Sequence, residues 1–145
     1  MNNYHKLLIM LAVSFIVMYV VMFLNIVDLG HIYLSMTRIY MALLMVCPMA
    51  LMMLFLMGRM YGNKKLNSAI IVVAVVVFII ALTFLRTQTF VDDSQYMKAM
   101  IPHHSSAIMT SENADIEDAE VKELAEQIII TQKEEIKIMK ELLNQ

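Results

Sequence analysis

The chain has 145 residues, of which 60% are hydrophobic and 17% are charged, and its mean hydropathy of +0.68 excludes an ordinary water-soluble domain. Its charge is unevenly spread: residues 1–85 hold five basic and one acidic residue, whereas residues 86–145 hold six basic and twelve acidic ones. Nucleic acid is excluded as a partner, because binding it requires clustered Lys and Arg. The single cysteine, Cys47, excludes a disulfide within the chain.

Three long runs contain no Asp, Glu, Lys or Arg: Leu7–Val27, Ile39–Met57 and Ala69–Leu85. A helix needs roughly 20 apolar residues to cross the hydrocarbon of a bilayer. The runs therefore predict three transmembrane helices near 7–27, 39–57 and 69–85, within a membrane domain of residues 1–88. Because the connectors are short, the helices should alternate in direction and pack as neighbours.

The orientation in the membrane follows from the basic residues of the connectors. The second connector holds Arg59, Lys64 and Lys65, whereas the first holds Arg38 beside Asp28. The positive-inside bias places the second connector in the cytoplasm. Three spans then predict a cytoplasmic N-terminus and an extracytoplasmic domain of residues 89–145.

Residues 89–145 have the pattern of a helical hairpin. The first helix should start at the cap formed by Asp92, Asp93 and Ser94 and run to about Glu112, with a turn over 113–115. The second should run from Ile116 to about Leu143, with an apolar stripe of Val121, Leu124, Ala125, Ile128, Ile136, Met139 and Leu142. A hairpin of this size buries little surface, so we expect a homo-oligomer in which two hairpins form a four-helix bundle.

The sixteen methionines suggest metal chemistry, because a thioether is a soft ligand as well as a filler of apolar cores. At about 100° per residue, Met97, Met100 and His104 share one face of the first hairpin helix. His103 lies about 100° away, so both imidazoles reach one ion only if Pro102 bends the helix or a partner helix lies between them. On the second helix Met139 faces the same site.

Two polar residues interrupt the apolar stripe of the second hairpin helix. Gln132 and Glu135 lie on the same arc as Ile128 and Met139. Either side chain could accept the free N–H of His104 and so orient the ring behind a bound metal. Thioether and neutral imidazole favour Cu(I), or the chemically similar Ag(I), over zinc.

The run Met97-x-x-Met100-Ile101-Pro102-His103-His104 resembles the signature of the bacterial family labelled domain of unknown function three hundred and five. The resemblance continues along the hairpin and into the membrane half, through Ser105, Ala107, Ile108, Ser111, Leu124-Ala125, Ile128, Gln132, Glu135-Ile136, Met139, His31, Ser35, Arg38, Tyr40 to Leu43, Met45 and Arg86 to Gln88. It implies a ferritin-like four-helix bundle, copper binding and copper tolerance in the bacterial envelope, and a three-span membrane subgroup. Met109 is left out of the site, because other members are expected to carry an aliphatic residue there.

The combined expectation is an all-α protein of the bacterial inner membrane that binds Cu(I) or Ag(I) for buffering, hand-over to copper-handling proteins or tolerance, and is not an enzyme. The expected metal ligands are Met97, Met100, His103, His104 and Met139. Two alternatives remain open. One is a membrane scaffold whose hairpin binds a partner protein without metal. The other is a copper transporter that uses the methionines of the second span, Met41, Met45, Met49, Met52, Met53 and Met57. A di-iron oxidoreductase is disfavoured, because such sites use Glu-x-x-His pairs, which this chain lacks.

Overall fold

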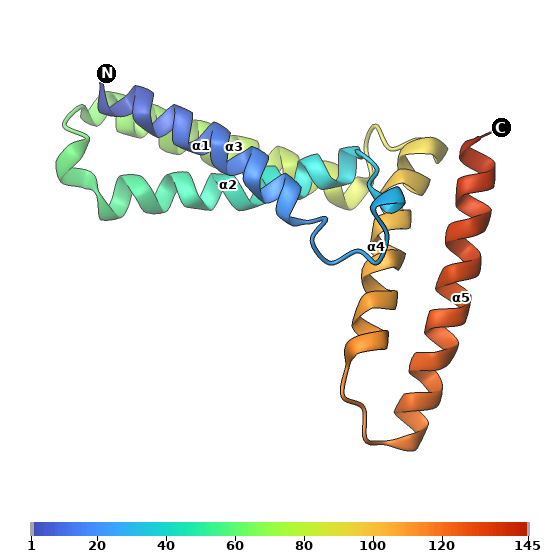
Figure 1. Ribbon diagram of the computed structural model, residues 1–145. Helices are drawn as coiled ribbons and strands as arrows, with labels where there is room; N and C mark the ends of the chain where they lie inside the picture. The colour runs from blue at the N-terminus through green and yellow to red at the C-terminus, as the bar shows by residue number, and fades with distance from the viewer. Residues whose placement is uncertain (1, 145) are drawn as a thin grey trace. The chain divides into compact units, whose positions relative to one another are not determined.

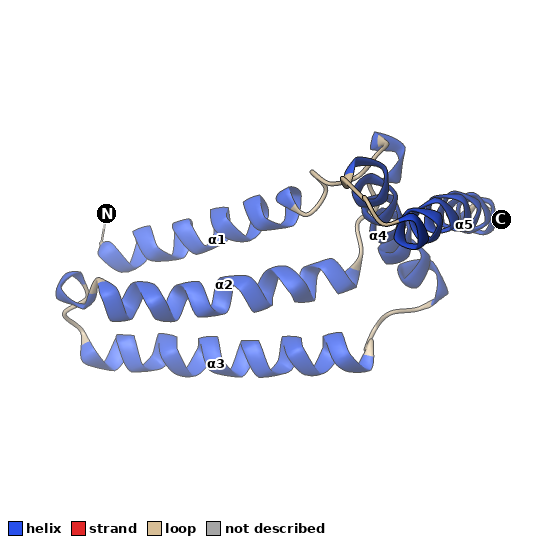
Figure 2. Cartoon of the chain, turned by 90° about the horizontal axis from the view of Figure 1, so that it is seen from below, coloured by secondary structure: helices blue, strands red, loops and turns tan. Residues whose placement is uncertain are grey.

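A computed structural model describes residues 2–144 and shows an all-α protein, 81% helical, with no strand in that range (Figure 2). The predicted fold class, three apolar helices followed by a hairpin, is confirmed. The chain divides into two compact units. The first holds the chain up to Val21 together with Thr37–Phe90, and the second holds Met22–Met36 together with the chain from Val91 on.

The first unit consists of three helices that run alongside one another in both views (Figures 1 and 2). They are α1 (Asn3–Val21), α2 (Met36–Leu56) and α3 (Lys64–Thr87), and all three are long and apolar enough to cross a membrane. Most of their large apolar side chains are exposed in the protein alone. This surface suits hydrocarbon, where exposed apolar groups carry no penalty.

The second and third spans match their predicted positions, and their differences lie at the ends. The third was expected to start at Ala69, after the basic and polar residues of the connector, but α3 begins at Lys64. The reason is a cap, because the side chain of Asn63 accepts a hydrogen bond from the backbone N of Leu66 at 3.1 Å. At the opposite end of α3, Gln88 adopts a left-handed conformation with φ of 51° and ends the helix.

A small apolar core lies where α1 begins. Leu7, Leu54 and Tyr61 form a buried cluster there. The hydroxyl of Tyr4 adds polar contacts at this end, donating to Asn67 Oδ1 at 2.8 Å and accepting from the backbone N of Asn63 at 3.0 Å. These contacts close the end of the unit that carries the second connector.

The first span is shorter than predicted. It was expected to continue to Val27, but α1 ends at Val21, and residues 22–36 belong to the unit of the hairpin and not to that of the spans. We call residues 22–36 the docking segment. Residues 22–27 were placed in the first span by their hydropathy, and residues 28–36 in the connector that follows it. The difference arises because polar groups of this segment bond to the hairpin, as described below.

The hairpin consists of α4 (Asp93–Asn113) and α5 (Ala119–Leu143), which lie side by side (Figure 1). The start of α4 is as predicted, with the side chain of Asp92 accepting from Gln95 N at 2.7 Å. The start of α5 differs from the predicted Ile116. Asp118 caps the helix instead, because its carboxylate accepts from the backbone N of Glu120 and of Val121 at 2.9 and 3.0 Å.

Ile101 and Ile108 of α4 and Ile136 of α5 form the buried core of the hairpin. Tyr33 of the docking segment packs against this core beside Ile129, Met139 and Leu143. The predicted stripe of α5 is only partly covered: Ala125 and Ile136 are buried, whereas Val121, Leu124 and Leu142 are 50%, 56% and 50% exposed. The docking segment thus covers part of the hairpin core, in addition to the second hairpin that was expected to cover it.

Candidate metal site

His104 is the polar centre of the hairpin. It lies in the middle of α4 and is only 8% exposed. Its Nε2 lies 2.6 Å from Oε2 of Glu135 on α5, so one side-chain contact joins the two helices. His104 and Glu135 can meet because each lies on the face of its helix that is turned toward the other helix.

The contact with Glu135 determines which ring nitrogen of His104 holds the proton. A carboxylate only accepts hydrogen bonds, so Nε2 must carry the hydrogen. The other nitrogen, Nδ1, is buried and has no hydrogen-bond partner among the described residues. A buried polar atom left without a partner costs about 1–3 kcal/mol. A lone pair that is held in place and not engaged by a donor is the arrangement that a metal ligand requires.

The predicted sulfur ligands lie on both hairpin helices near one end of the core. Met97 of α4 and Met139 of α5 line the same open hollow of about 650 Å³, together with Asp93, Ser94, Tyr96, Leu142 and Leu143. Met100 is partly buried one turn before His104. The side chain of a helical residue leans toward the N-terminus of its helix, so His104 leans toward Met100.

His103 has a different environment from His104. Its side chain is exposed, and the two rings are 6.0 Å apart with an interplanar angle of 63°. α4 continues as a regular helix across Pro102, so it does not show the break that would turn both imidazoles to one side. The structure therefore brings His104 and Glu135 together, and Met97 with Met139, but leaves His103 outward.

Gln132 is half-buried on α5, and no hydrogen bond joins its side chain to another described residue. Within residues 2–144, no three His, Cys, Asp or Glu side chains gather where they could hold a metal. The site predicted from the sequence depends on thioether sulfur and one buried imidazole.

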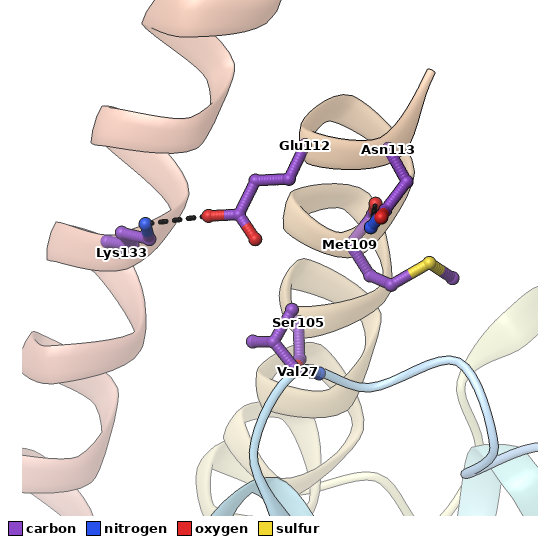
Figure 3. Close-up of polar contacts among 6 residues, drawn as sticks. All are labelled: Val27, Ser105, Met109, Glu112, Asn113 and Lys133. Atoms are coloured by element: carbon purple, nitrogen blue, oxygen red, sulfur yellow. Dashed lines mark hydrogen bonds and ion pairs between the residues drawn. The ribbon is translucent and has the colours of Figure 1, made fainter. Parts of the chain in front are cut away.

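The docking segment contacts α4 at two adjacent serines, a feature that the sequence analysis did not anticipate. Ser105 is fully buried, and its Oγ accepts from the backbone N of Val27 at 2.9 Å (Figure 3). The same Oγ lies 2.9 Å from Nδ1 of His31, and Asn25 donates to Ser106 Oγ at 2.5 Å. In the sequence, Ser105 and His31 stood out only as residues that share the family resemblance, and nothing indicated that they are in contact.

His31 is shifted toward its neutral form. Burial lowers its pKa from the ordinary 6.5, and the positive charge of Lys140 on α5 lowers it further, while Asp28 raises it. A hollow of about 350 Å³ beside His31 is also lined by the oppositely charged Glu112 and Lys133. These two form an ion pair at 2.8 Å across the hairpin (Figure 3), but both side chains are well exposed, so the pair adds little stability.

Residues 80–145 match the model of a protein family described as Domain of unknown function (DUF305). The chain belongs to this family. The DUF305 match starts within α3 and contains the whole hairpin, including His104 and Glu135. It does not contain the docking segment.

A second comparison covers the membrane helices as well. The chain is similar to an uncharacterized protein of Acanthamoeba polyphaga mimivirus, with 38% identity over 148 residues that cover 100% of this chain and 95% of the relative. This DUF305 chain therefore shares its whole length with a viral protein, and the comparison does not support the expected bacterial origin. No solved structure matches the chain significantly.

Proposed function

We propose that this DUF305 protein is a membrane-anchored binder of Cu(I) or Ag(I) that serves metal buffering, hand-over or tolerance. The observation that supports it most is the state of His104, a buried imidazole whose Nε2–H is engaged by Glu135 and whose Nδ1 has no partner. A neutral imidazole with its second nitrogen fixed in this way is the common form of a metal-binding histidine. The proposal contains no catalytic step.

The chemistry of the surrounding donors favours a soft monovalent ion. Met97, Met100 and Met139 would supply thioether sulfur, and His104 would supply one nitrogen. Such ligands select Cu(I) over zinc, which relies on thiolate, imidazole and carboxylate. His103 would bind the same ion only after α4 rearranges. Gln132 stays a predicted hydrogen-bond partner of His104 that does not itself touch the metal.

Topology and assembly belong to the same proposal. The N-terminus and the basic residues Arg59, Lys64 and Lys65 would lie in the cytoplasm, and the hairpin would lie on the other side, as in the bacterial inner membrane that the resemblance implies. The half-exposed Val121, Leu124 and Leu142 are the side chains that the hairpin of a second copy would cover in a four-helix bundle.

The test is Cu(I) retention by the purified full-length protein in mild detergent, measured against a chelator of known affinity. We expect a defined amount of Cu(I) per chain to remain bound when the chelator is in excess, and Zn²⁺ offered under the same conditions to be lost. Protein that releases all its Cu(I) to the chelator would overturn the proposal.

A copper transporter is the second candidate, and one observation favours it. One open hollow of about 390 Å³ is lined by four methionines of α2 and one that directly follows the helix, namely Met45, Met49, Met52, Met53 and Met57, with Pro48 and Leu56. The hollow gathers thioethers along the half of α2 that leads to the second connector. If they carry Cu(I), liposomes that contain the pure protein will accumulate copper faster than empty liposomes. A variant with these five residues changed to Leu should lose the uptake and keep the retention by the hairpin.

A further inference from the structure

The docking segment fixes one side of α4 next to the proposed metal ligand. Its backbone N at Val27 and its imidazole at His31 both bond to Ser105 Oγ, and Asn25 bonds to Ser106. Tyr33 adds an apolar contact with the hairpin core. These are contacts between residues about 80 positions apart in sequence, and the central one, Ser105, is completely buried.

Two directions of attachment determine how α4 is turned about its own axis. Glu135 on α5 holds the side chain of His104, and the docking segment holds the side chain of Ser105, which projects about 100° away around the helix. A helix held from two sides cannot rotate without breaking one of these part-buried hydrogen bonds. The direction of Nδ1 of His104 is therefore set jointly by α5 and by the docking segment.

We propose that Ser105 and His31 are positioning residues of the metal site, through which the docking segment keeps Nδ1 of His104 directed toward the thioethers. The inference rests on the proposed function. Neither residue would touch the ion, since the side chain of Ser105 bonds to Val27 and His31 and both of these belong to the docking segment.

The contact between His31 and Ser105 depends on the charge of His31. A neutral His31 can accept the hydroxyl hydrogen of Ser105 at Nδ1 while Oγ accepts from Val27 N–H. A protonated His31 must donate at Nδ1, so Oγ would receive two donors and its own hydrogen would need a new acceptor. The charged groups that face His31 are Asp28 on its own segment and Lys140 on α5, with Glu112 of α4 and Lys133 of α5 around the neighbouring hollow.

The direction of the pH effect follows from the lowered pKa of His31. A folded-state pKa below the ordinary 6.5 means that the contact contributes fully above that pH, and that the contribution is lost as the pH falls from there toward the folded-state pKa. Metal retention by the folded protein should fall where His31 itself becomes protonated, at a pH below 6.5 that is set by its lowered pKa. Replacing His31 by Gln keeps a hydrogen-bonding group and removes the titration, so this part of the pH dependence should disappear.

The experiment measures Cu(I) affinity by chelator competition on the full-length protein at about pH 7.5 and about pH 5.5. Ser105→Ala is expected to weaken Cu(I) binding by about tenfold, the lower end of the effect of removing an outer partner. His31→Gln should bind nearly as wild type at the higher pH and lose less affinity than wild type at the lower pH. The matched controls are Ser111→Ala on α4 and His5→Gln on α1, which should behave as wild type at both values.

The outcomes separate this inference from the function on which it rests. If the wild-type protein binds Cu(I) but Ser105→Ala binds it with unaltered affinity, the positioning role alone is overturned. The same conclusion follows if His31→Gln shows the same pH dependence as the wild type. Wild-type protein that retains no Cu(I) overturns both. If Ser105→Ala lowers the helicity of the protein, the pH comparison with His31→Gln, which removes no buried hydroxyl, decides the question.

Discussion

The triple variant Met97→Leu, Met100→Leu and His104→Gln is expected to bind Cu(I) at least about a thousandfold less tightly than wild type. Each ligand removed should cost at least the roughly tenfold loss that follows from removing an outer partner. Leucine preserves the volume of methionine without its sulfur, and glutamine can still donate a hydrogen bond to Glu135. The measurement is competition with a Cu(I) chelator in detergent, with circular dichroism to compare the helicity.

The control for the triple variant is Met109→Leu. Met109 lies on the same helix as the site, but in Figure 3 its side chain points away from Lys133 of α5. The Met109→Leu variant should bind Cu(I) with the affinity of the wild type. Retention that survives the triple change would show that the hairpin thioethers and His104 are ordinary packing, as the scaffold alternative requires.

Replacing Glu135 by Ala is expected to weaken Cu(I) binding by about 10- to 100-fold. The carboxylate is 2.6 Å from Nε2 of His104, so its loss leaves that N–H without its acceptor and frees the ring to turn. Glu135→Gln should have a smaller effect, because the amide oxygen still accepts a hydrogen bond but carries no charge. Affinities from chelator competition give this ranking directly.

Glu134 is the matched control, because it is an exposed carboxylate on the same turn of α5. Glu134→Ala changes the net charge as Glu135→Ala does, so a general electrostatic effect would appear equally in both. Equal affinities for the two variants would contradict a specific role of Glu135 in holding the ring.

The elements of the fold were predictable where hydropathy and caps coincide. The three charge-free runs and the Asp92 cap located four helices well, because these signals are local. The end of α1 was not predictable in the same way: residues 22–27 hold no charge and extend the apolar run, but Asn25 and Val27 bond to Ser106 and Ser105 of the hairpin. The second hairpin helix was predicted to begin at Ile116, two residues before the Asp118 cap that starts it in the structure.

The site was predictable in part. A helical wheel was enough to place His104 and Glu135 on facing arcs, and the structure puts them in contact. It could not tell that His103 is exposed, since that depends on whether α4 bends at Pro102. It also could not reveal His31 as a neighbour of Ser105, because 74 residues separate them and no periodic pattern relates a loop to a helix.

The contacts of the docking segment with the hairpin, through Val27, His31 and Tyr33, affect where a domain boundary should be drawn in this chain. The stretch that defines DUF305 in this chain begins at residue 80, yet the folded body around α4 includes residues 22–36 as well. A fragment cut at the family boundary would expose the isoleucine core beneath Tyr33 and strip Ser105 of both its partners. The evolutionary module and the physical module are therefore different pieces of the polypeptide.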